Sequence, residues 1–416
     1  MSIDTAVTVA GHRPGTSGYR RIVVALFAAG VATFTLLYST QALLPALATE
    51  FGVGAGTSAW SLSATMLGLA VALLVAGPLS DRVGRTPLIH ASLALAALVG
   101  VACAFAPSWP VLLVLRTLEG VALAGLPAVA TAYLREELHP ATHARAVGLY
   151  VGGTAIGGMT GRLLTGAVAD VGGWRWALGA AAALGLVCAA VVRALLPRSE
   201  HFEPRSAGWR SVLTTTRLAL RDRALLALFG IGGCSIGVLT VVFNTVGFRL
   251  ALPPFSLGLG VASLLFCVYP LGSVSSAVAG RVADRYGRRS VLPVACLVAL
   301  AGVALTLPAS LPLLVVGLAL VICGFFAIHG VASGWVPARA HAAGLATGQA
   351  ASLYLFAYYV GASVFGALGG HAWTDAGWPR VALLAAGLVA VVGALALVLR
   401  RTPSLLPDRG PVGAHP

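Results

Sequence analysis

Charged residues are scarce in this sequence of 416 residues, and lysine is absent altogether. Only 10% of the residues are charged and 58% are hydrophobic, whereas about 25% of the residues of a typical soluble domain are charged. The chain therefore has too few polar side chains to solvate the surface of a globular protein of this size. We expect its solvent to be a lipid bilayer, in which long apolar helices are stable.

Motifs that carry metal or nucleotide chemistry are also missing. The sequence has no His-Glu-x-x-His and no Gly-rich nucleotide-binding loop, so neither metal-dependent hydrolysis nor ATP hydrolysis is expected. The six cysteines lie inside apolar segments without Cys-x-x-Cys spacing, which favours packing over disulfide bonds or metal binding. We therefore expect no enzyme, no metal site and no bound cofactor.

Twelve apolar segments are long enough to cross a membrane, since about 20 residues in a helix span the hydrocarbon layer. They must be helical, because lipid-exposed backbone has to satisfy its own hydrogen bonds. The predicted spans are 22–48, 58–80, 87–106, 110–134, 144–169, 174–196, 224–248, 257–280, 290–308, 312–336, 344–369 and 378–399. The sequence thus predicts an all-α membrane protein with twelve transmembrane helices.

A polar, Arg-rich segment divides these spans into two sets of six. The predicted organisation is an N-terminal tail at 1–20, a six-helix bundle at 21–196, a linker at 197–223, a second six-helix bundle at 224–400 and a C-terminal tail at 401–416. Arginine sets the orientation: 22 of the 27 arginines fall on the side of the two tails. Because cytoplasmic loops of membrane proteins are enriched in positive charge, we expect both tails and the linker to be cytoplasmic. Charges spread over several loops also argue against nucleic-acid binding.

The two halves repeat at an offset of 203–204 residues. After the second span, Asp81, Arg82, Gly84 and Arg85 match Asp284, Arg285, Gly287 and Arg288 after the eighth span, and Trp174 matches Trp378. A repeat of half the chain length predicts duplication, with the halves related by a pseudo-two-fold axis along the membrane normal.

The segment after the second span resembles the signature of the major facilitator superfamily, G-x-L-x-D-R-x-G-R. Its fixed positions are all filled, by Gly77, Leu79, Asp81, Arg82, Gly84 and Arg85. A weaker copy follows the eighth span. This resemblance implies a twelve-helix fold of two pseudo-symmetric bundles, which moves small molecules across a membrane by alternating access.

In that family the signature aspartates help to latch the two halves together on the cytoplasmic side. The resemblance implies that Asp81 meets the start of span eleven, and that Asp284 meets the start of span five near Arg145. The latch residues would be Gly77, Asp81, Arg82, Gly84, Arg85, Asp284, Arg285, Gly287, Arg288 and Arg145. An alternative for the arginines is that they only set the membrane topology.

Three charged residues lie inside predicted spans, where ionisable groups are costly and often functional. Arg116 and Glu119 share one face of span four, and Arg162 of span five lies at a similar depth, so an ion pair among them is feasible. The stretch from Arg116 to Gly120 resembles the R-x-x-Q-G motif of facilitators that exchange protons for drugs, with Glu119 in place of Gln. A carboxylate can bind and release a proton whereas an amide cannot. The alternative is a structural ion pair between spans four and five.

Span five also resembles the antiporter signature G-x-x-x-G-P-x-x-G-G of exporters. Gly153, Gly157 and Gly161 keep their places, whereas Gly158 replaces the proline and Arg162 replaces the last glycine. Glycines spaced four apart equally describe a face for close helix packing, so both interpretations stay open.

The resemblance implies a central substrate cavity lined by spans one, four, seven and ten, with contributions from two, five, eight and eleven. Polar and aromatic residues available there are Tyr38, Gln41, Asn244, Tyr269, His329, Tyr354 and Tyr358. An apolar pocket with a few polar groups suits a small organic ligand. Each of these residues has helix packing as its alternative role.

Together these features predict a secondary transporter, a proton-coupled exporter of a small organic compound such as a drug, a metabolite or a sugar. Its energy source would be the proton gradient, and its partners would be the substrate, protons and membrane lipid. We expect a monomer in the inner membrane of a bacterium. The alternatives are an uptake or facilitated-diffusion carrier of the same fold and a non-transporting membrane sensor.

Overall fold

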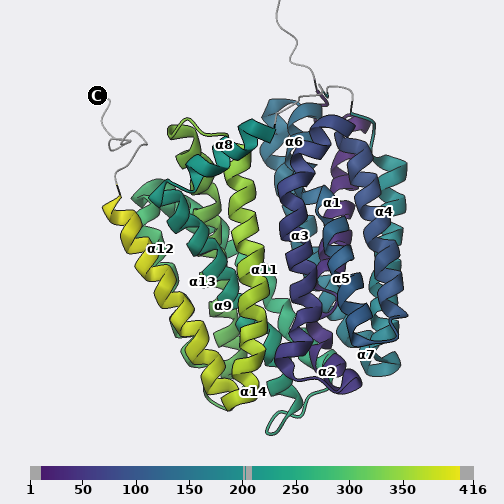
Figure 1. The fold of residues 1–416 in the computed structure, drawn as a ribbon, viewed down its shortest axis with the longest axis vertical. Helices are drawn as coiled ribbons and strands as arrows, with labels where there is room; N and C mark the ends of the chain where they lie inside the picture. Colours follow the sequence, from purple (N-terminus) through teal and green to yellow (C-terminus); the bar gives the residue numbers. More distant parts are fainter. Residues whose placement is uncertain (1–10, 200–201, 203–208, 403–416) are drawn as a thin grey trace, which may run out of the picture. The chain divides into compact units, whose positions relative to one another are not determined.

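The computed structural model describes residues 11–199, 202 and 209–402, and the regular structure in these ranges is helical. Parts of the two predicted tails, at 1–10 and 403–416, and part of the linker lie outside the described residues. The longer helices are labelled in Figure 1. The helices are α1 (Ser17–Tyr38), η1 (Gln41–Leu43), α2 (Leu44–Phe51), α3 (Ala55–Val83), α4 (Arg85–Ala104), α5 (Trp109–Leu123), α6 (Gly125–Glu137), η2 (Pro140–Thr142), α7 (His143–Leu195), α8 (Trp209–Ala219), α9 (Arg223–Ala251), α10 (Leu259–Ser263), η3 (Leu264–Val268), α11 (Tyr269–Tyr286), α12 (Arg288–Leu305), α13 (Leu311–Ala342) and α14 (Thr347–Arg401).

Ten helical segments among the described residues are long and apolar enough to cross a membrane, and two of them hold two spans each. α7 has 53 residues, about 80 Å of helix at ~1.5 Å per residue, which is more than twice the hydrocarbon thickness. It breaks at Gly173, where φ is 78° and ψ is 177°. α14 breaks in the same way at Ala376 and Gly377. Dividing both helices at these breaks gives the twelve predicted spans and confirms the fold class.

The first span is interrupted within the apolar region. α1 ends at Tyr38, and the chain continues through the short η1 before α2 begins, with Pro45 in the first turn of α2. Pro45 has no N–H to donate to the carbonyl of Gln41, so the helical hydrogen-bond pattern does not continue through this segment into α2. The sequence predicts one continuous helix at 22–48 and does not reveal this break.

The chain forms two compact units, and each is described by itself. The first contains the described residues of Met1–Val53, Ala64–Ser206 and Leu257–Phe266, and the second contains those of Gly54–Ser63, Ala207–Ser256 and Cys267–Pro416.

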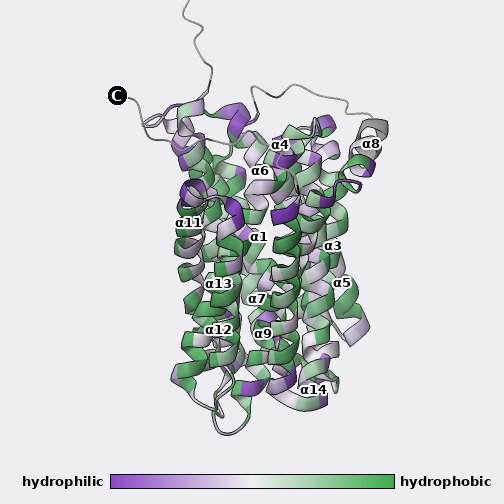
Figure 2. Cartoon of the chain, turned by 90° about the vertical axis from the view of Figure 1, so that its left-hand side faces the viewer, coloured by the Kyte–Doolittle hydropathy of each residue, from purple (hydrophilic) through white to green (hydrophobic). Residues whose placement is uncertain are grey.

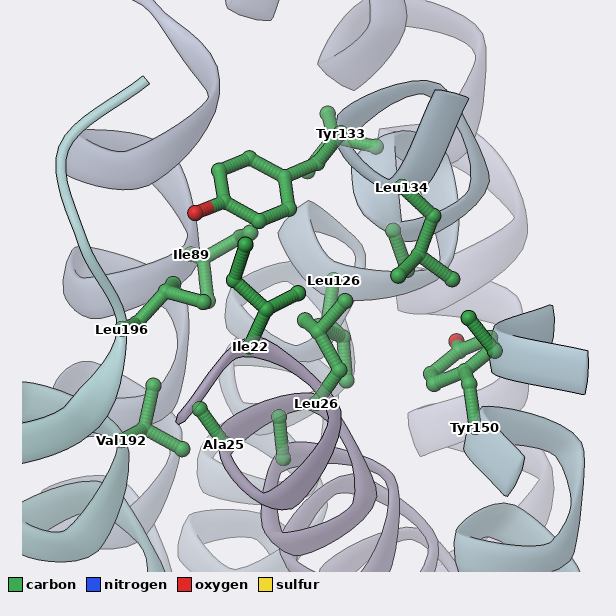
Figure 3. Packing of buried hydrophobic residues seen from close by; sticks show 14 of the residues in the cluster. Ile22, Ala25, Leu26, Ile89, Leu126, Tyr133, Leu134, Tyr150, Val192 and Leu196 are labelled. Carbon is green, nitrogen blue, oxygen red and sulfur yellow. The ribbon is translucent and has the colours of Figure 1, made fainter. Parts of the chain in front are cut away.

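Apolar side chains hold the first unit together at the end where α1 begins. Ile22, Ala25 and Leu26 of α1 pack against Leu126 and Leu134 of α6 and against further apolar residues of α4 and α7 (Figure 3). Figure 2 shows apolar residues along the middle of the helices and hydrophilic residues mostly toward their ends. This pattern is typical of helices that cross a bilayer.

Candidate functional site

Arg116 is fully buried on α5 and binds the end of α1. Its guanidinium donates hydrogen bonds to the carbonyl oxygens of Leu36 at 3.2 Å and Leu37 at 3.0 Å, and to Ser39 Oγ at 3.0 Å. The break in α1 leaves these last-turn carbonyls without the usual donors four residues further on. A cation is also favoured at a helix C-terminus by the helix dipole. Arg116 therefore stabilises the interruption in the first span.

Glu119 lies one turn further along α5 and pairs with Arg116. Its Oε2 is 2.5 Å from Arg116 Nη1, and each side chain is only 1% exposed. Cys103 of α4 also donates to Oε2, at 3.8 Å. The second oxygen, Oε1, is buried and has no hydrogen-bond partner within the described residues. It therefore keeps its lone pairs available for a proton.

Gly100 of α4 makes room for this carboxylate. A Cβ atom at position 100 would lie 3.1 Å from Glu119 Oε1 and 3.1 Å from a methyl carbon of Leu36. Such separations are shorter than ordinary van der Waals contact. A glycine at this position therefore lets α4 approach the ion pair closely.

Arg162 of α7 binds the other side of the same break in α1. Its Nε donates to Gln41 Oε1 at 2.5 Å, and its Nη1 donates to the carbonyl of Gly158 at 2.6 Å. The guanidinium carbon lies 3.8 Å from the ring centre of Tyr38, a distance at which cation–π attraction is strong. The three buried charges thus form two groups, Arg116 with Glu119 and Arg162 with Gln41 and Tyr38. Both groups contact the segment from Leu36 to Gln41.

The three glycines spaced four apart on α7 form the surface that contacts α1. A Cβ at Gly153, Gly157 or Gly161 would lie 3.0, 2.7 or 2.9 Å from a Cα atom of α1. The Cα atoms belong, in that order, to Phe27, Val31 and Thr35. Only glycine permits backbones this close. Gly158, which follows Gly157 directly, supplies the carbonyl oxygen that accepts a hydrogen bond from Arg162.

Three of the predicted cavity residues lie together in the second unit. Tyr354 Oη and His329 Nδ1 are 2.9 Å apart in a hydrogen bond, and the His329 and Tyr358 ring centres are 4.9 Å apart. Phe325, which the sequence analysis did not single out, stacks on His329 at 5.7 Å and 14°. The ring of His329 is thus held by three aromatic neighbours from α13 and α14.

Tyr269 and Asn244 lie elsewhere in the same unit. Tyr269, at the start of α11, packs edge-on against Phe243 at 5.3 Å and against Phe326 at 6.5 Å. Asn244 is buried on α9, and a Cβ at Gly366 would lie 2.8 Å from its amide nitrogen. Phe326 also packs edge-on against Phe325 at 5.0 Å, so the aromatic residues predicted for the cavity in the second unit form one connected cluster, and Asn244 is a separate buried amide.

The signature between α3 and α4 has its own internal contacts. Arg85 pairs with Asp81 at 2.7 Å and with Glu136 of α6 at 3.0 Å, and it also donates to Ser80 Oγ. Gly84 turns the chain into α4 with φ of 94°, and Gly287 turns it into α12 with φ of 85°. These left-handed conformations explain why the repeat has glycine there.

Three of the remaining latch residues are exposed in their own units, whereas Arg288 of α12 is half-buried. Asp284 and Arg285 of α11 and Arg145 of α7 have solvent-accessible side chains. The contacts of Asp81 and Asp284 with the opposite half stay predictions.

The ion pair between Asp222 and Arg339 was not predicted from the sequence. Asp222 Oδ1 accepts hydrogen bonds from the backbone N–H groups of Ala224 and Leu225 at the start of α9, at 2.8 and 3.0 Å. Its Oδ2 pairs with Arg339 of α13 at 2.9 Å. An Asp directly before an apolar run is typical of a helix N-cap, so the cap could have been predicted. Its cationic partner, 117 residues away, could not.

A Gly-x-Ser-x-Gly pattern does occur inside α9, from Gly233 to Gly237. In hydrolases that pattern forms a sharp strand-to-helix turn that exposes the serine. Here Ser235 is buried in a continuous helix, and its Oγ donates to the carbonyl of Gly232 at 3.0 Å. The pattern therefore has no catalytic geometry.

Comparisons with known proteins agree with this architecture. The model of the Major Facilitator Superfamily matches residues 25–348. The chain is 41% identical over 367 residues to the uncharacterized MFS-type transporter YybF of Bacillus subtilis (strain 168), covering 88% of this chain and 90% of that protein. It is also 41% identical over 367 residues to the inner membrane transport protein YnfM of Escherichia coli (strain K12), covering 88% and 87%.

Two solved structures share the fold at low sequence identity. A variant of the nucleoside transporter NupG has a TM-score of 0.71 at 16% identity and covers 91% of this chain and 99% of its own. The xylose transporter XylE from E. coli has a TM-score of 0.68 at 15% identity and covers 93% and 98%. With the signature, the repeat and the twelve spans, these matches show that the chain belongs to the major facilitator superfamily and is a multi-pass membrane transporter.

Proposed function

We propose that this transporter exports a small organic compound in exchange for protons and that Glu119 is the proton-coupling group. The single observation that carries the proposal is the buried Arg116–Glu119 pair at the break of α1. A carboxylate that couples transport to protons must be able to exist inside the protein in both its charged and its neutral form. For a buried carboxylate, the stability of each form depends on the neighbouring charges and hydrogen bonds.

The surroundings of Glu119 accommodate both forms. When Glu119 is ionised, Arg116 balances its charge at 2.5 Å. When it is protonated, Arg116 still has three other acceptors in Leu36, Leu37 and Ser39, so the arginine is not left without hydrogen bonds. Arg116 thus keeps hydrogen-bond partners whether Glu119 is ionised or protonated, and this suits a site that binds and releases a proton reversibly.

The same contacts connect the proton to helix movement. Protonation removes the negative charge that attracts Arg116, and so changes the interaction of the arginine with the carbonyls that end α1. Arg162 holds the other side of this break through Gln41. The residue that corresponds to Glu119 in the second half is Cys323, which places the proposed coupling in the first half alone.

The proposed substrate is a small organic molecule with an apolar body and a few polar groups. Phe325, His329, Tyr354 and Tyr358 offer aromatic faces with one imidazole and two hydroxyls, and Tyr38 and Gln41 offer a similar mixture in the first unit. Apolar and aromatic side chains with a few polar groups are the kind of residues that bind small organic ligands.

We further propose the inner membrane of a bacterium as the location, a cytoplasmic position for both termini, and a monomeric state. The arginine distribution supports the orientation, and a relative named an inner membrane transport protein supports the location.

The test begins with a compound screen. A panel of aromatic dyes, antibiotics and sugars is added to a bacterial host that lacks its own efflux pumps and expresses the chain. We expect at least one compound to accumulate less than in host cells without the chain. If accumulation only rises, the chain is an uptake carrier and the export proposal is wrong.

The exported compound is then used in proteoliposomes with an imposed pH difference. The wild type is expected to move it against its gradient, and Glu119→Gln is expected to allow only equilibration, because the amide cannot exchange a proton yet still accepts a hydrogen bond from Arg116. The matched control is Glu50→Gln, which removes an exposed carboxylate paired with Arg175 and should leave uphill transport intact. Uphill transport by Glu119→Gln would show that Glu119 is not the coupling site, and equilibration by the wild type would indicate facilitated diffusion.

A further inference from the structure

A basic cavity of about 550 Å³ lies in the first unit, between the start of α4 and the segment that follows α7. It belongs neither to the α1 break nor to the aromatic cluster. Its charged lining residues are Arg82, Arg85, Arg193 and Arg198, with His90 beside them. No carboxylate lines the cavity in the ranges 11–199, 202 and 209–402 that the structure describes.

Three of these arginines have no counter-ion among the described residues. Arg85 is neutralised by Asp81 and Glu136. By contrast, Arg82, Arg193 and Arg198 have exposed side chains and no ion-pair partner in the part of the chain that the structure describes. Like charges held together without counter-ions repel each other. An anion in the cavity would remove this repulsion.

Hydrogen-bond donors surround the same space. The N-terminus of the 20-residue helix α4 opens at Gly84, and no side chain caps it, so its first N–H groups can bind an anion. His90 also lines the cavity, and its buried Nε2 has no hydrogen-bond partner within the described residues, whereas the hydroxyl of Thr86 already donates to the carbonyl of Pro197. These neutral donors suit the oxygens of a phosphate group.

The remaining wall of the cavity is apolar and continues along the helices. Val83, Pro87, Leu196 and Phe202 line it, and Val83 is 51% exposed. This mixture of free arginines and exposed apolar side chains differs from a site for a small soluble anion, which would be polar throughout.

Exposed leucines extend this apolar surface away from the arginines. On α4, Leu98 follows Pro87 by three helical turns on the same face and is 59% exposed. On α7, Leu186 precedes Arg193 by two turns on the same face and is 39% exposed. Each helix thus presents charge at its end and apolar side chains toward its middle, as at a membrane surface.

The cavity is not a product of the repeat. At an offset of 204, Arg193 corresponds to Leu397 and Arg198 corresponds to Thr402. The second half therefore keeps the signature arginines but lacks counterparts of Arg193 and Arg198. The signature alone does not create the basic cavity.

We propose that this basic cavity binds the phosphate headgroup of an anionic phospholipid, whose acyl chains lie along the exposed apolar residues of α4 and α7. Clusters of basic residues at the cytoplasmic end of transmembrane helices bind such headgroups. This proposal is independent of the transported substrate and of Glu119.

The experiment uses the full chain in detergent and native mass spectrometry with phosphatidylglycerol or phosphatidylcholine of identical acyl chains. The wild type is expected to retain phosphatidylglycerol in preference. The double variant R193Q/R198Q is expected to lose about 25-fold in apparent affinity for phosphatidylglycerol, at about fivefold per arginine. R193K/R198K keeps the charge and should keep most of the preference. Elution volume and thermal midpoint check that each variant is folded.

The matched control is R400Q/R401Q, which removes two exposed arginines at the end of α14 and should bind phosphatidylglycerol like the wild type. If R193Q/R198Q binds phosphatidylglycerol as tightly as the wild type, the proposal is overturned. It is also overturned if R400Q/R401Q loses as much affinity as R193Q/R198Q, because the loss would then be a general effect of surface charge. In a parallel arm, inorganic phosphate and glycerol 3-phosphate are added alone. Displacement of the lipid by either at millimolar concentration would assign the cavity to a soluble phosphate and overturn the lipid assignment.

Discussion

Gly157 is the position at which one added methyl group tests the contact between α7 and α1. A Cβ atom there would lie 2.7 Å from Val31 Cα and 2.9 Å from its carbonyl carbon. Both are backbone atoms, so no side-chain rotation can relieve the clash. In Gly157→Ala, α1 must therefore move away from α7, close to the segment that Arg116 and Arg162 bind.

Gly152→Ala on the same helix provides the control, because a Cβ at Gly152 meets no heavy atom within 4 Å. Replacing glycine by alanine inside a helix stabilises it by about 1 kcal/mol, and this gain applies to both variants. Overpacking costs about 1–3 kcal/mol and applies to Gly157→Ala alone. The Gly157→Ala protein should therefore be about 1–3 kcal/mol less stable than the Gly152→Ala protein.

Thermal unfolding of the purified proteins in one detergent measures this difference. For a unit of about 200 residues, each kcal/mol corresponds to about 2–4 °C in the midpoint. A Gly157→Ala midpoint equal to or above that of Gly152→Ala would refute the close-packing argument. If transport were lost at unchanged stability, the glycines would have a role in the transport cycle beyond packing.

Two further predictions concern ion pairs at the helix ends. Asp81→Asn leaves Arg85 paired with Glu136, so we expect a folded protein whose turnover in proteoliposomes falls several-fold while substrate binding changes little. Glu136→Gln is the control and should leave turnover near the wild-type value. Asp222→Ala removes both the cap of α9 and the partner of Arg339, and should destabilise the protein by about 2–4 kcal/mol. Asp222→Asn keeps the cap, and its thermal midpoint should lie between those of Asp222→Ala and the wild type.

Other results would exclude these roles. Wild-type turnover in Asp81→Asn, with substrate binding unchanged, would remove the latch role of Asp81. Equal midpoints for Asp222→Asn and Asp222→Ala would mean that the cap contributes nothing measurable beyond the ion pair.

Composition and the length of the apolar segments were sufficient to predict the membrane class and the twelve spans, and the resemblance of the segment from Gly77 to Arg85 to a family signature predicted the family. Each of these depends on local properties: apolar length decides whether a helix can cross the bilayer, and glycine at positions 84 and 287 reflects a backbone conformation that is set within a few residues. The breaks at Gly173 and Gly377 were also placed correctly, between predicted spans five and six and between spans eleven and twelve.

Which buried charges pair with each other was decided only by the tertiary structure. The sequence predicted that Arg116, Glu119 and Arg162 lie at one depth in the membrane, where all three could interact. In the structure Arg162 binds Gln41, 121 residues away, and Arg116 binds α1 carbonyls that are available only because that helix ends at Tyr38.

The physical reason is that an ion pair in an apolar interior forms where the desolvated groups find complementary partners within about 3 Å. Such a distance depends on how three helices pack, and helix packing depends on contacts far apart in the chain. The sequence thus determined that costly charges lie inside the membrane, while the fold determined that they meet at the break of the first helix.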